Sequence, residues 1–232
     1  MSREVAAANS ALIAYPKQAA FGRTLPKNKI YEHSGANTRL KNLFVAQVEQ
    51  VIWQYKLAPE TINLPARPSV PEIQIFSVQL KTSELHEDVL RCIDGAVQFP
   101  IIFELHQGQG DQAQTRVVAA YKRPSEADAS RWVLTDYFAT DWLPSTSPRA
   151  SMPLALDMAA LYEALLYRLI PLPARPQEPL ADLVARVEKA QIKQRELDKT
   201  TTRLAKEKQF NRKVEINAEL RKLKTELEGL KQ

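Results

Sequence analysis

The chain has few of the residues that disulfide-bonded, zinc-bound or membrane-spanning proteins depend on. Cys92 is its single cysteine, which excludes an internal disulfide and favours a reducing compartment. The histidines are scattered singly, so the paired ligand spacing of a zinc site is missing. Even the apolar stretch over residues 154–170 contains three charged side chains, and the N-terminal residues lack the apolar core of a signal peptide. We therefore expect a cytoplasmic protein with no membrane segment, metal or cofactor.

Motifs for catalysis are also scarce. Gly108 and Gly110 lie in a turn between two expected strands. A phosphate-binding loop would need the start of a helix and a following Lys-Ser or Lys-Thr pair, and neither is present here. A metal-dependent nuclease built on a mixed sheet needs carboxylates grouped at a strand end, typically with an acidic residue two positions before a lysine. That spacing does not occur, and the other carboxylates are spread through loops and strand ends. The sequence predicts no catalytic residue.

The net charge of +5 is distributed unevenly. Residues 1–56 hold 8 basic and 3 acidic side chains, residues 57–179 hold 10 and 15, and residues 180–232 hold 14 and 9. Basic ends flank an acidic middle, a distribution that suits contact with phosphate or with an acidic protein surface. A well-solvated helical surface explains the same lysines equally well. The candidate nucleic-acid contacts are Lys27, Lys29, Arg39, Lys41, Lys206, Lys208, Arg212 and Lys213.

The first 170 residues alternate between helical and strand patterns. Apolar side chains at helical spacing predict one helix from residue 38 to residue 55. A strand over 73–80, a helix over 85–96 and a strand over 99–105 form a βαβ unit, whose two strands pair in parallel. Further strands over 115–121 and 131–138 continue as an antiparallel meander, and a helix over 154–170 covers one face. We expect an α/β (α+β) fold with a mixed sheet.

Proline, glycine and charge divide the chain into four parts. Residues 1–36 contain two prolines and two glycines among basic side chains and predict an irregular basic arm. Residues 37–170 are the α/β body. Residues 171–179 contain four prolines and predict a stiff hinge. Residues 180–232 form the tail.

The tail has the pattern of a coiled-coil helix. It contains no proline, and its apolar residues recur at three-four spacing in two stripes whose register changes between Leu204 and Ile216. A continuous helix with so narrow a stripe needs a second surface, from another protein or a second copy of the chain. A break into a helical hairpin near residues 200–202 is the alternative. The candidate partner-binding residues are Leu183, Val187, Leu197, Leu204, Ile216, Leu220, Leu223 and Leu227.

Four runs of sequence resemble a known family. They are residues 40–45 (LKNLFV) through 52–63 (IWQYKLAPETIN), residues 72–76 (EIQIF), residues 93–96 (IDGA) followed by 100–103 (PIIF), and residues 208–217 (KQFNRKVEIN). Together they resemble the bacterial and archaeal family called domain of unknown function 4391. The resemblance implies genes that often lie beside DNA methyltransferases and helicase-like restriction subunits. It implies no catalytic residue.

These observations lead to one expected function and two alternatives. We expect a non-enzymatic adaptor of a DNA restriction or antiphage defence assembly, which binds a protein partner, such as a methyltransferase or helicase subunit, through the tail. Non-specific DNA contacts by the basic ends would add to this binding. The alternatives are a divergent metal-dependent nuclease of the same system and a homodimeric DNA-binding protein.

Overall fold

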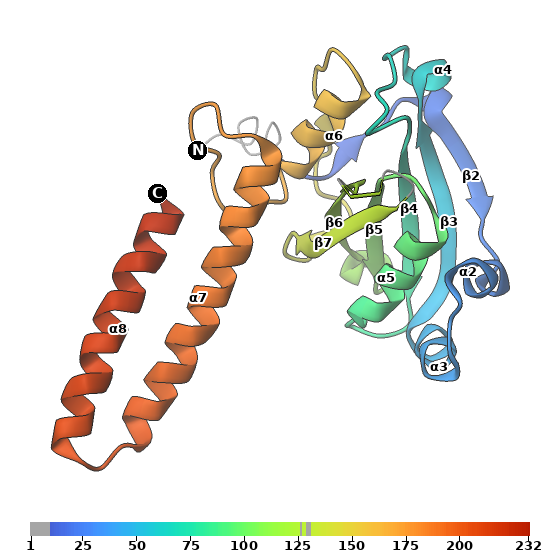
Figure 1. The fold of residues 1–232 in the computed structure, drawn as a ribbon. Helices are drawn as coiled ribbons and strands as arrows, with labels where there is room; N and C mark the ends of the chain where they lie inside the picture. Colours follow the sequence, from blue (N-terminus) through green and yellow to red (C-terminus); the bar gives the residue numbers. More distant parts are fainter. Residues whose placement is uncertain (1–9, 126, 129–130) are drawn as a thin grey trace. The chain divides into compact units, whose positions relative to one another are not determined.

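A computed structural model describes residues 10–125, 127–128 and 131–232. The chain divides into two compact units, residues 1–169 and residues 170–232. The first unit is built on a sheet, and the second is a pair of helices (Figure 1).

The first unit contains a seven-stranded mixed sheet. Its strands are hydrogen-bonded in the order β2-β3-β4-β5-β6-β7, and the short β8 also pairs with β6. Only β4 and β5 are parallel, while the other neighbours are antiparallel. The strands are β2 (Ala20–Thr24), β3 (Val48–Leu57), β4 (Ile73–Leu80), β5 (Ile101–Gln107), β6 (Gln114–Pro124), β7 (Trp132–Ala139) and β8 (Leu143–Pro144).

The middle of the sheet follows the sequence pattern. β4, the helix α5 (Glu87–Ala96) and β5 form the expected βαβ unit, with Phe76 opposite Phe103 in the parallel ladder. The antiparallel strands β6 and β7 then continue from β5, as the meander predicts. The connection from β5 to β6 contains the short 3₁₀ helix η2 (Gly110–Gln112). The mixed α+β fold is therefore confirmed.

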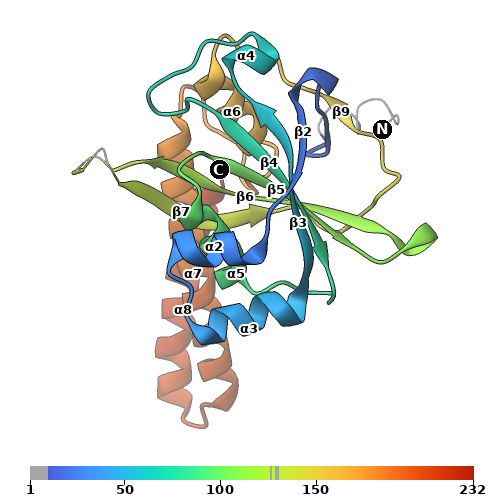
Figure 2. The ribbon, with the colours of Figure 1, turned by 90° about the vertical axis from the view of Figure 1, so that its right-hand side faces the viewer.

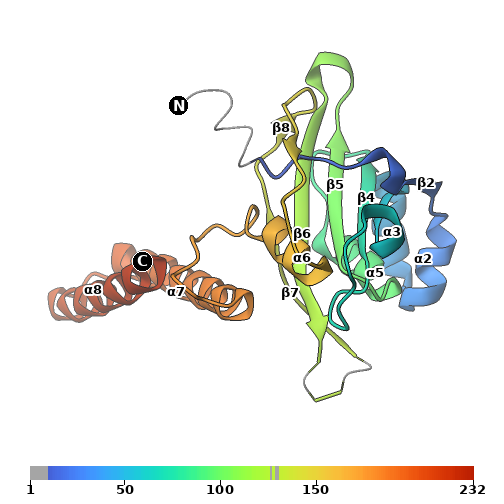
Figure 3. The same cartoon turned by 90° about the horizontal axis from the view of Figure 1, so that it is seen from above.

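Helices cover both faces of the sheet (Figure 3). On one face, α2 (Lys27–Ser34) packs against α5, and α3 (Thr38–Gln47) packs against α5 and β3 (Figure 2). On the other face lies α6 (Met158–Leu166), whose Tyr162 hydroxyl accepts a hydrogen bond from the Lys122 amide and donates one to the Ala120 carbonyl. The core between the sheet and α2, α3 and α5 includes Ile30, Phe44, Val51, Phe76, Val78, Val89, Ile93 and Phe103.

Four short elements complete the first unit. β1 (Ile13–Ala14) and β9 (Ala150–Ser151) pair in parallel as a separate two-stranded sheet. The 3₁₀ helix η1 (Lys17–Ala19) precedes β2. The helix α4 (Pro59–Ile62) follows β3.

The single helix predicted over residues 38–55 is wrong in its second half. Asn37 caps α3 as a helix start, because its side chain accepts from the Leu40 amide at 3.0 Å, but the helix ends at Gln47. β3 begins at the next residue. Its β-branched Val51 and Ile52 pair with Val78 and Ser77 of β4, so sheet formation overrides the helical spacing.

The predicted irregular arm over residues 1–36 is also corrected. Residues 1–9 lie outside the described residues, but the rest forms β1, η1, β2 and α2. The Phe21 ring lies 4.2 Å from the Trp53 ring, and Ile30 is buried in the core. Pro16, Pro26 and Gly35 mark boundaries between short elements that tertiary contacts hold in place, whereas Gly22 lies within β2.

The second unit is a helical hairpin. α7 (Leu180–Lys206) and α8 (Phe210–Lys231) pack along each other, joined by residues 207–209 (Figure 1). The tail is thus helical as predicted, and it takes the hairpin form that the sequence left open. The reversal lies between Leu204 and Ile216, where the apolar register changes, a few residues beyond the expected threonines.

The proline-rich residues 171–179 belong to the second unit. They contain no helix or strand. Arg186 of α7 donates to the Pro173 carbonyl, and Arg175 donates to the Gly229 carbonyl of α8, both at 2.7 Å. This segment is therefore fastened to the hairpin. No helix in the described part of the chain combines the length and apolar character that crossing a membrane requires.

Candidate functional site

The turn of the hairpin brings together the basic residues predicted in the tail. Lys206, Lys208, Arg212 and Lys213 all have exposed side chains. Within the described residues, none of the four takes part in an ion pair. Together with the turn residues 207–211 we call them the hairpin tip. It lies where α7 ends and α8 begins (Figure 1).

The acidic residue of the tip, Glu207, is used in building the turn. Its carboxylate accepts hydrogen bonds from the backbone amides of Lys208 and Gln209, both at 2.8 Å. These bonds, with that from Gln209 foremost, lower the pKa of Glu207, and the charges of Arg212 and Lys213 act in the same direction. A helix start needs acceptors for its free amides, and Glu207 supplies one to the turn that begins α8.

Apolar side chains are exposed at the same place. Phe210 is 77% exposed and Val214 is 54% exposed. Phe210, in the first turn of α8, does not pack into the seam between the helices. An exposed aromatic ring among basic side chains is a feature of surfaces that bind single-stranded nucleic acid.

The other four candidate bases lie in the first unit, and each interacts with a neighbour there. Lys27 donates to the carbonyl of Val48 at 2.5 Å and to that of Phe44 at 3.4 Å, at the end of α3. Burial, with the charge of Lys81, lowers the pKa of Lys27. Lys29 pairs with Glu32 at 2.8 Å, Arg39 lies 3.7 Å from Asp88, and Lys41 lies over the Tyr31 ring.

Most of the predicted partner-binding residues are buried in the chain itself. Leu197 and Leu204 are half-buried. Ion pairs between Arg203 and Glu219, and between Lys193 and Glu226 at 3.0 Å, link the two helices along their length. Binding a partner through this seam would therefore require the helices to separate. The buried members are Leu183, Val187, Ile216, Leu220, Leu223 and Leu227.

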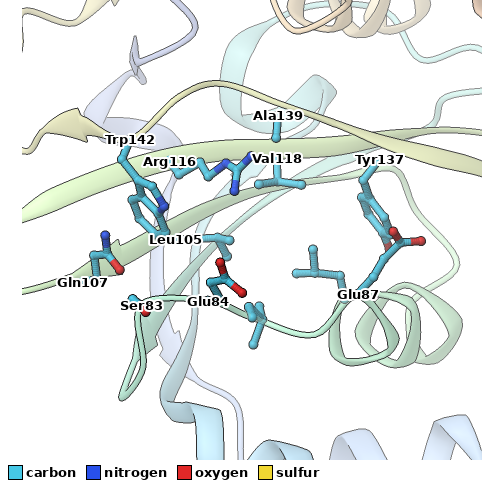
Figure 4. A pocket seen from close by; sticks show the side chains of 12 residues that line it. Ser83, Glu84, Glu87, Leu105, Gln107, Arg116, Val118, Tyr137, Ala139 and Trp142 are labelled. Atoms are coloured by element: carbon cyan, nitrogen blue, oxygen red, sulfur yellow. The ribbon is translucent and has the colours of Figure 1, made fainter. Parts of the chain in front are cut away.

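A cleft of about 650 Å³ opens beside α5 in the first unit (Figure 4). It lies at the carboxyl ends of the parallel strands β4 and β5, where open α/β sheets commonly bind ligands. Leu105, Val118 and Ala139 come from three adjacent strands, and the loop after β4 with the start of α5 supplies the opposite side. The polar and aromatic side chains of the lining are Ser83, Glu84, Glu87, Gln107, Arg116, Tyr137 and Trp142.

Three polar groups of the cleft have distinct hydrogen-bonding capacities. Arg116 donates from Nε to the Thr140 carbonyl at 2.8 Å, and its guanidinium lies 6.0 Å from the Trp142 ring. The carboxylate of Glu84 has no hydrogen bond or ion pair within the described residues. Gln107 donates from Nε2 to Gln114 at 2.9 Å, which leaves its buried Oε1 without a donor. The cleft thus presents a free carboxylate and a cationic donor, and an unpaired amide oxygen is buried in its wall.

The turn after Gln107 depends on a glycine. Gly108 has φ of 73°, and a Cβ at this position would clash with the Gln112 carbonyl oxygen. Only glycine takes this conformation without strain. Gly108 and Gly110 therefore build the turn between β5 and β6, as the sequence indicates.

Sequence reasoning missed the cleft because its residues are far apart in the chain. Glu84 follows β4, Gln107 ends β5, and Trp142 follows β7. No local motif links these positions, and only the order of the strands brings them together. As for metals, no three His, Cys, Asp or Glu residues among those described lie close enough to hold an ion.

Comparison with protein families accounts for nearly the whole chain. The model of the domain of unknown function DUF4391 matches residues 13–227. The chain belongs to the DUF4391 family. The match runs from β1 in the first unit to α8 in the second, so the DUF4391 pattern includes both the sheet and the hairpin. No curated protein and no solved structure matches the chain.

Proposed function

We propose that this DUF4391 protein is an accessory subunit that contacts nucleic acid through the hairpin tip, and that it serves a DNA restriction or antiphage defence assembly. The single observation that carries the nucleic-acid contact is the group of four exposed basic side chains at the tip. Contacts of this kind neutralise phosphates and release counterions, and they do not read base sequence.

The distribution of charge supports the tip as the contact point. Elsewhere in the hairpin, some basic side chains pair with acidic ones, as in the pairs Arg203–Glu219 and Lys193–Glu226. At the tip, the one carboxylate, Glu207, is engaged by backbone amides. The positive charge therefore remains available to a polyanion.

The proposed setting rests on the family and not on the geometry. The family resemblance implies genes that often lie beside DNA methyltransferases and helicase-like restriction subunits. An accessory subunit that holds DNA without sequence preference would complement subunits that methylate or translocate it. Because the seam leucines are occupied by the hairpin, a protein partner would meet other surfaces, such as the half-exposed Ile192 of α7.

Fluorescence anisotropy with a short DNA duplex tests the contact at about 50 mM and 200 mM salt. If each of the four bases meets one phosphate, log K should fall with log salt with a slope of about −3.6. Simultaneous reversal of Lys206, Lys208, Arg212 and Lys213 to glutamate should remove most of the binding and flatten the slope. Unrelated duplex sequences should be affected alike.

A matched control carries the same change of net charge away from the tip. Arg195, Lys222, Lys224 and Lys231 are exposed on α7 and α8, and their reversal to glutamate should leave most of the binding in place. Equal losses in the two variants would mean that net charge alone drives binding. Binding that is absent or insensitive to salt would remove nucleic acid from the proposal.

A further inference from the structure

We propose that the cleft beside α5 binds a guanine base, and this inference rests on the proposed nucleic-acid function. It names a second contact, to a base that is unpaired or extruded from its helix, in addition to the phosphate contact of the tip. The observations that carry it are the capacities of Glu84, Gln107 and Arg116, together with the aromatic ring of Trp142 (Figure 4).

The hydrogen-bonding groups of the cleft complement one base better than the others. Glu84 offers a carboxylate and Gln107 a buried carbonyl oxygen, and both accept hydrogen bonds. Arg116 retains guanidinium donors beyond the Nε–H that binds Thr140. Guanine presents two adjacent donors, N1–H and the N2 amino group, beside the O6 acceptor. Cytosine and adenine each present a single amino donor on that edge, so one acceptor of the cleft would remain unpaired.

The unpaired Gln107 oxygen favours a ligand that donates a hydrogen bond. A buried acceptor without a partner is unfavourable relative to a satisfied one. The amide orientation is fixed by the bond from its nitrogen to Gln114, so the oxygen is the atom that remains for a ligand. The oxygen has almost no accessible surface, so a ligand amino group would satisfy it only after the neighbouring side chains shift aside.

The walls of the cleft are suited to a planar ring. Trp142 and Tyr137 both line it, and exposed bases bind proteins by stacking on such rings. Leu105, Val118 and Ala139 provide an apolar floor. A volume of about 650 Å³ lies within the range of small-molecule sites and leaves room for a nucleotide.

Calorimetric titration of the full-length protein with GMP, AMP, CMP and UMP tests the assignment. GMP should bind at least tenfold more tightly than the other three, on the scale of a bidentate base contact. Glu84→Gln should weaken GMP binding about tenfold or more, because a neutral amide replaces the charged acceptor. Glu84 is exposed in a loop, so this change leaves the fold intact.

The matched control is Glu49→Gln, which neutralises an exposed carboxylate of β3 that does not line the cleft. It should bind GMP like the unchanged protein. Trp142→Leu provides a second test, since loss of the ring should weaken all four nucleotides together. A dT oligonucleotide with one central dG distinguishes a base within a strand from a free nucleotide, because it should bind more tightly than GMP if the strand is the natural ligand.

The two proposals fail separately. The tip variant should keep its GMP affinity, and Glu84→Gln should keep its salt-dependent binding to duplex DNA. Equal affinity for the four nucleotides, or no binding at millimolar concentration, would overturn the guanine assignment. Binding of free arginine without binding of GMP would also overturn it, since the cleft would then accept a cationic side chain.

Discussion

Arg186 and Glu178 form a two-point ion pair that joins the proline-rich segment to α7. Arg186 donates from Nε and Nη2 to the two carboxylate oxygens of Glu178, each at 2.7 Å. Its Nη1 also donates to the Leu230 carbonyl of α8 at 2.7 Å. One side chain therefore ties the segment, the start of α7 and the end of α8 together. Arginine suits this role because its fork geometry matches a carboxylate bidentately.

This pair predicts that the hairpin weakens in acid. The hydrogen bonds from Arg186, followed by that from the Arg175 amide, lower the pKa of Glu178 to about 2 from an ordinary value of 4.5. Because the folded pKa is the lower one, the stabilisation is complete above about pH 4.5 and is lost as the pH falls toward 2. Melting curves followed at 222 nm between pH 2 and pH 7 measure the effect. Glu178→Gln should remove this part of the acid dependence, and an unchanged profile would contradict the prediction.

The seam of the hairpin should tolerate no charge. Leu220→Asp places a carboxylate between the helices and should cost several kcal/mol, because the charge has no partner there. Ala218→Asp is the matched control, since Ala218 is exposed on the same helix and should change the stability little. Far-ultraviolet circular dichroism of both variants compares the loss of helix. Similar losses in the two would indicate that the helices do not depend on this seam.

The first unit should fold without the hairpin. It has its own sheet, core and covering helices, and the boundary between the units follows Leu169. A chain that ends at Leu169 should therefore unfold cooperatively in urea. An unfolded product would show that the first unit needs residues of the second for its stability.

The ion pair between Arg149 and Glu104 should hold the N-terminal strand to the sheet. Arg149 donates from Nη1 and Nη2 to the two oxygens of Glu104, both at 2.7 Å, and Nη1 also donates to the Ile13 carbonyl of β1. Arg149→Met leaves the buried Glu104 carboxylate unpaired and should cost about 3 kcal/mol, the lower end for a broken buried pair because Arg149 is partly exposed.

A double-mutant cycle checks this pair. Urea denaturation of Arg149→Met, Glu104→Leu and the double variant separates the pair interaction from the packing of each side chain. The double variant should be more stable than Arg149→Met alone, because no buried charge remains. Additive losses would show that the two residues act independently.

The sequence by itself determined the elements whose patterns are local. Three elements lie close together in the chain: β4 with its alternating apolar residues, the amphipathic helix α5 and the apolar strand β5. A strand, a helix and a second strand connected in this order place the two strands parallel to each other. The proline segment and the two apolar stripes of the tail are equally local, and the change of register between Leu204 and Ile216 marks the stretch in which the chain reverses. The basic side chains of the tip also stand close together in the sequence, so their grouping needs no long-range contact.

Tertiary structure decided what local patterns leave ambiguous. Val51 and Ile52 satisfy a helical spacing and a strand equally well, and pairing with β4 selects the strand. The stripe of the tail specifies an apolar partner but not its source, and the reversal at residues 207–209 supplies α8 as the partner of α7. The cleft depends on side chains from Glu84 to Trp142 that meet only because β5, β6 and β7 lie side by side. Contacts between distant residues depend on the order of the strands, and a single sequence does not encode that order in any local pattern.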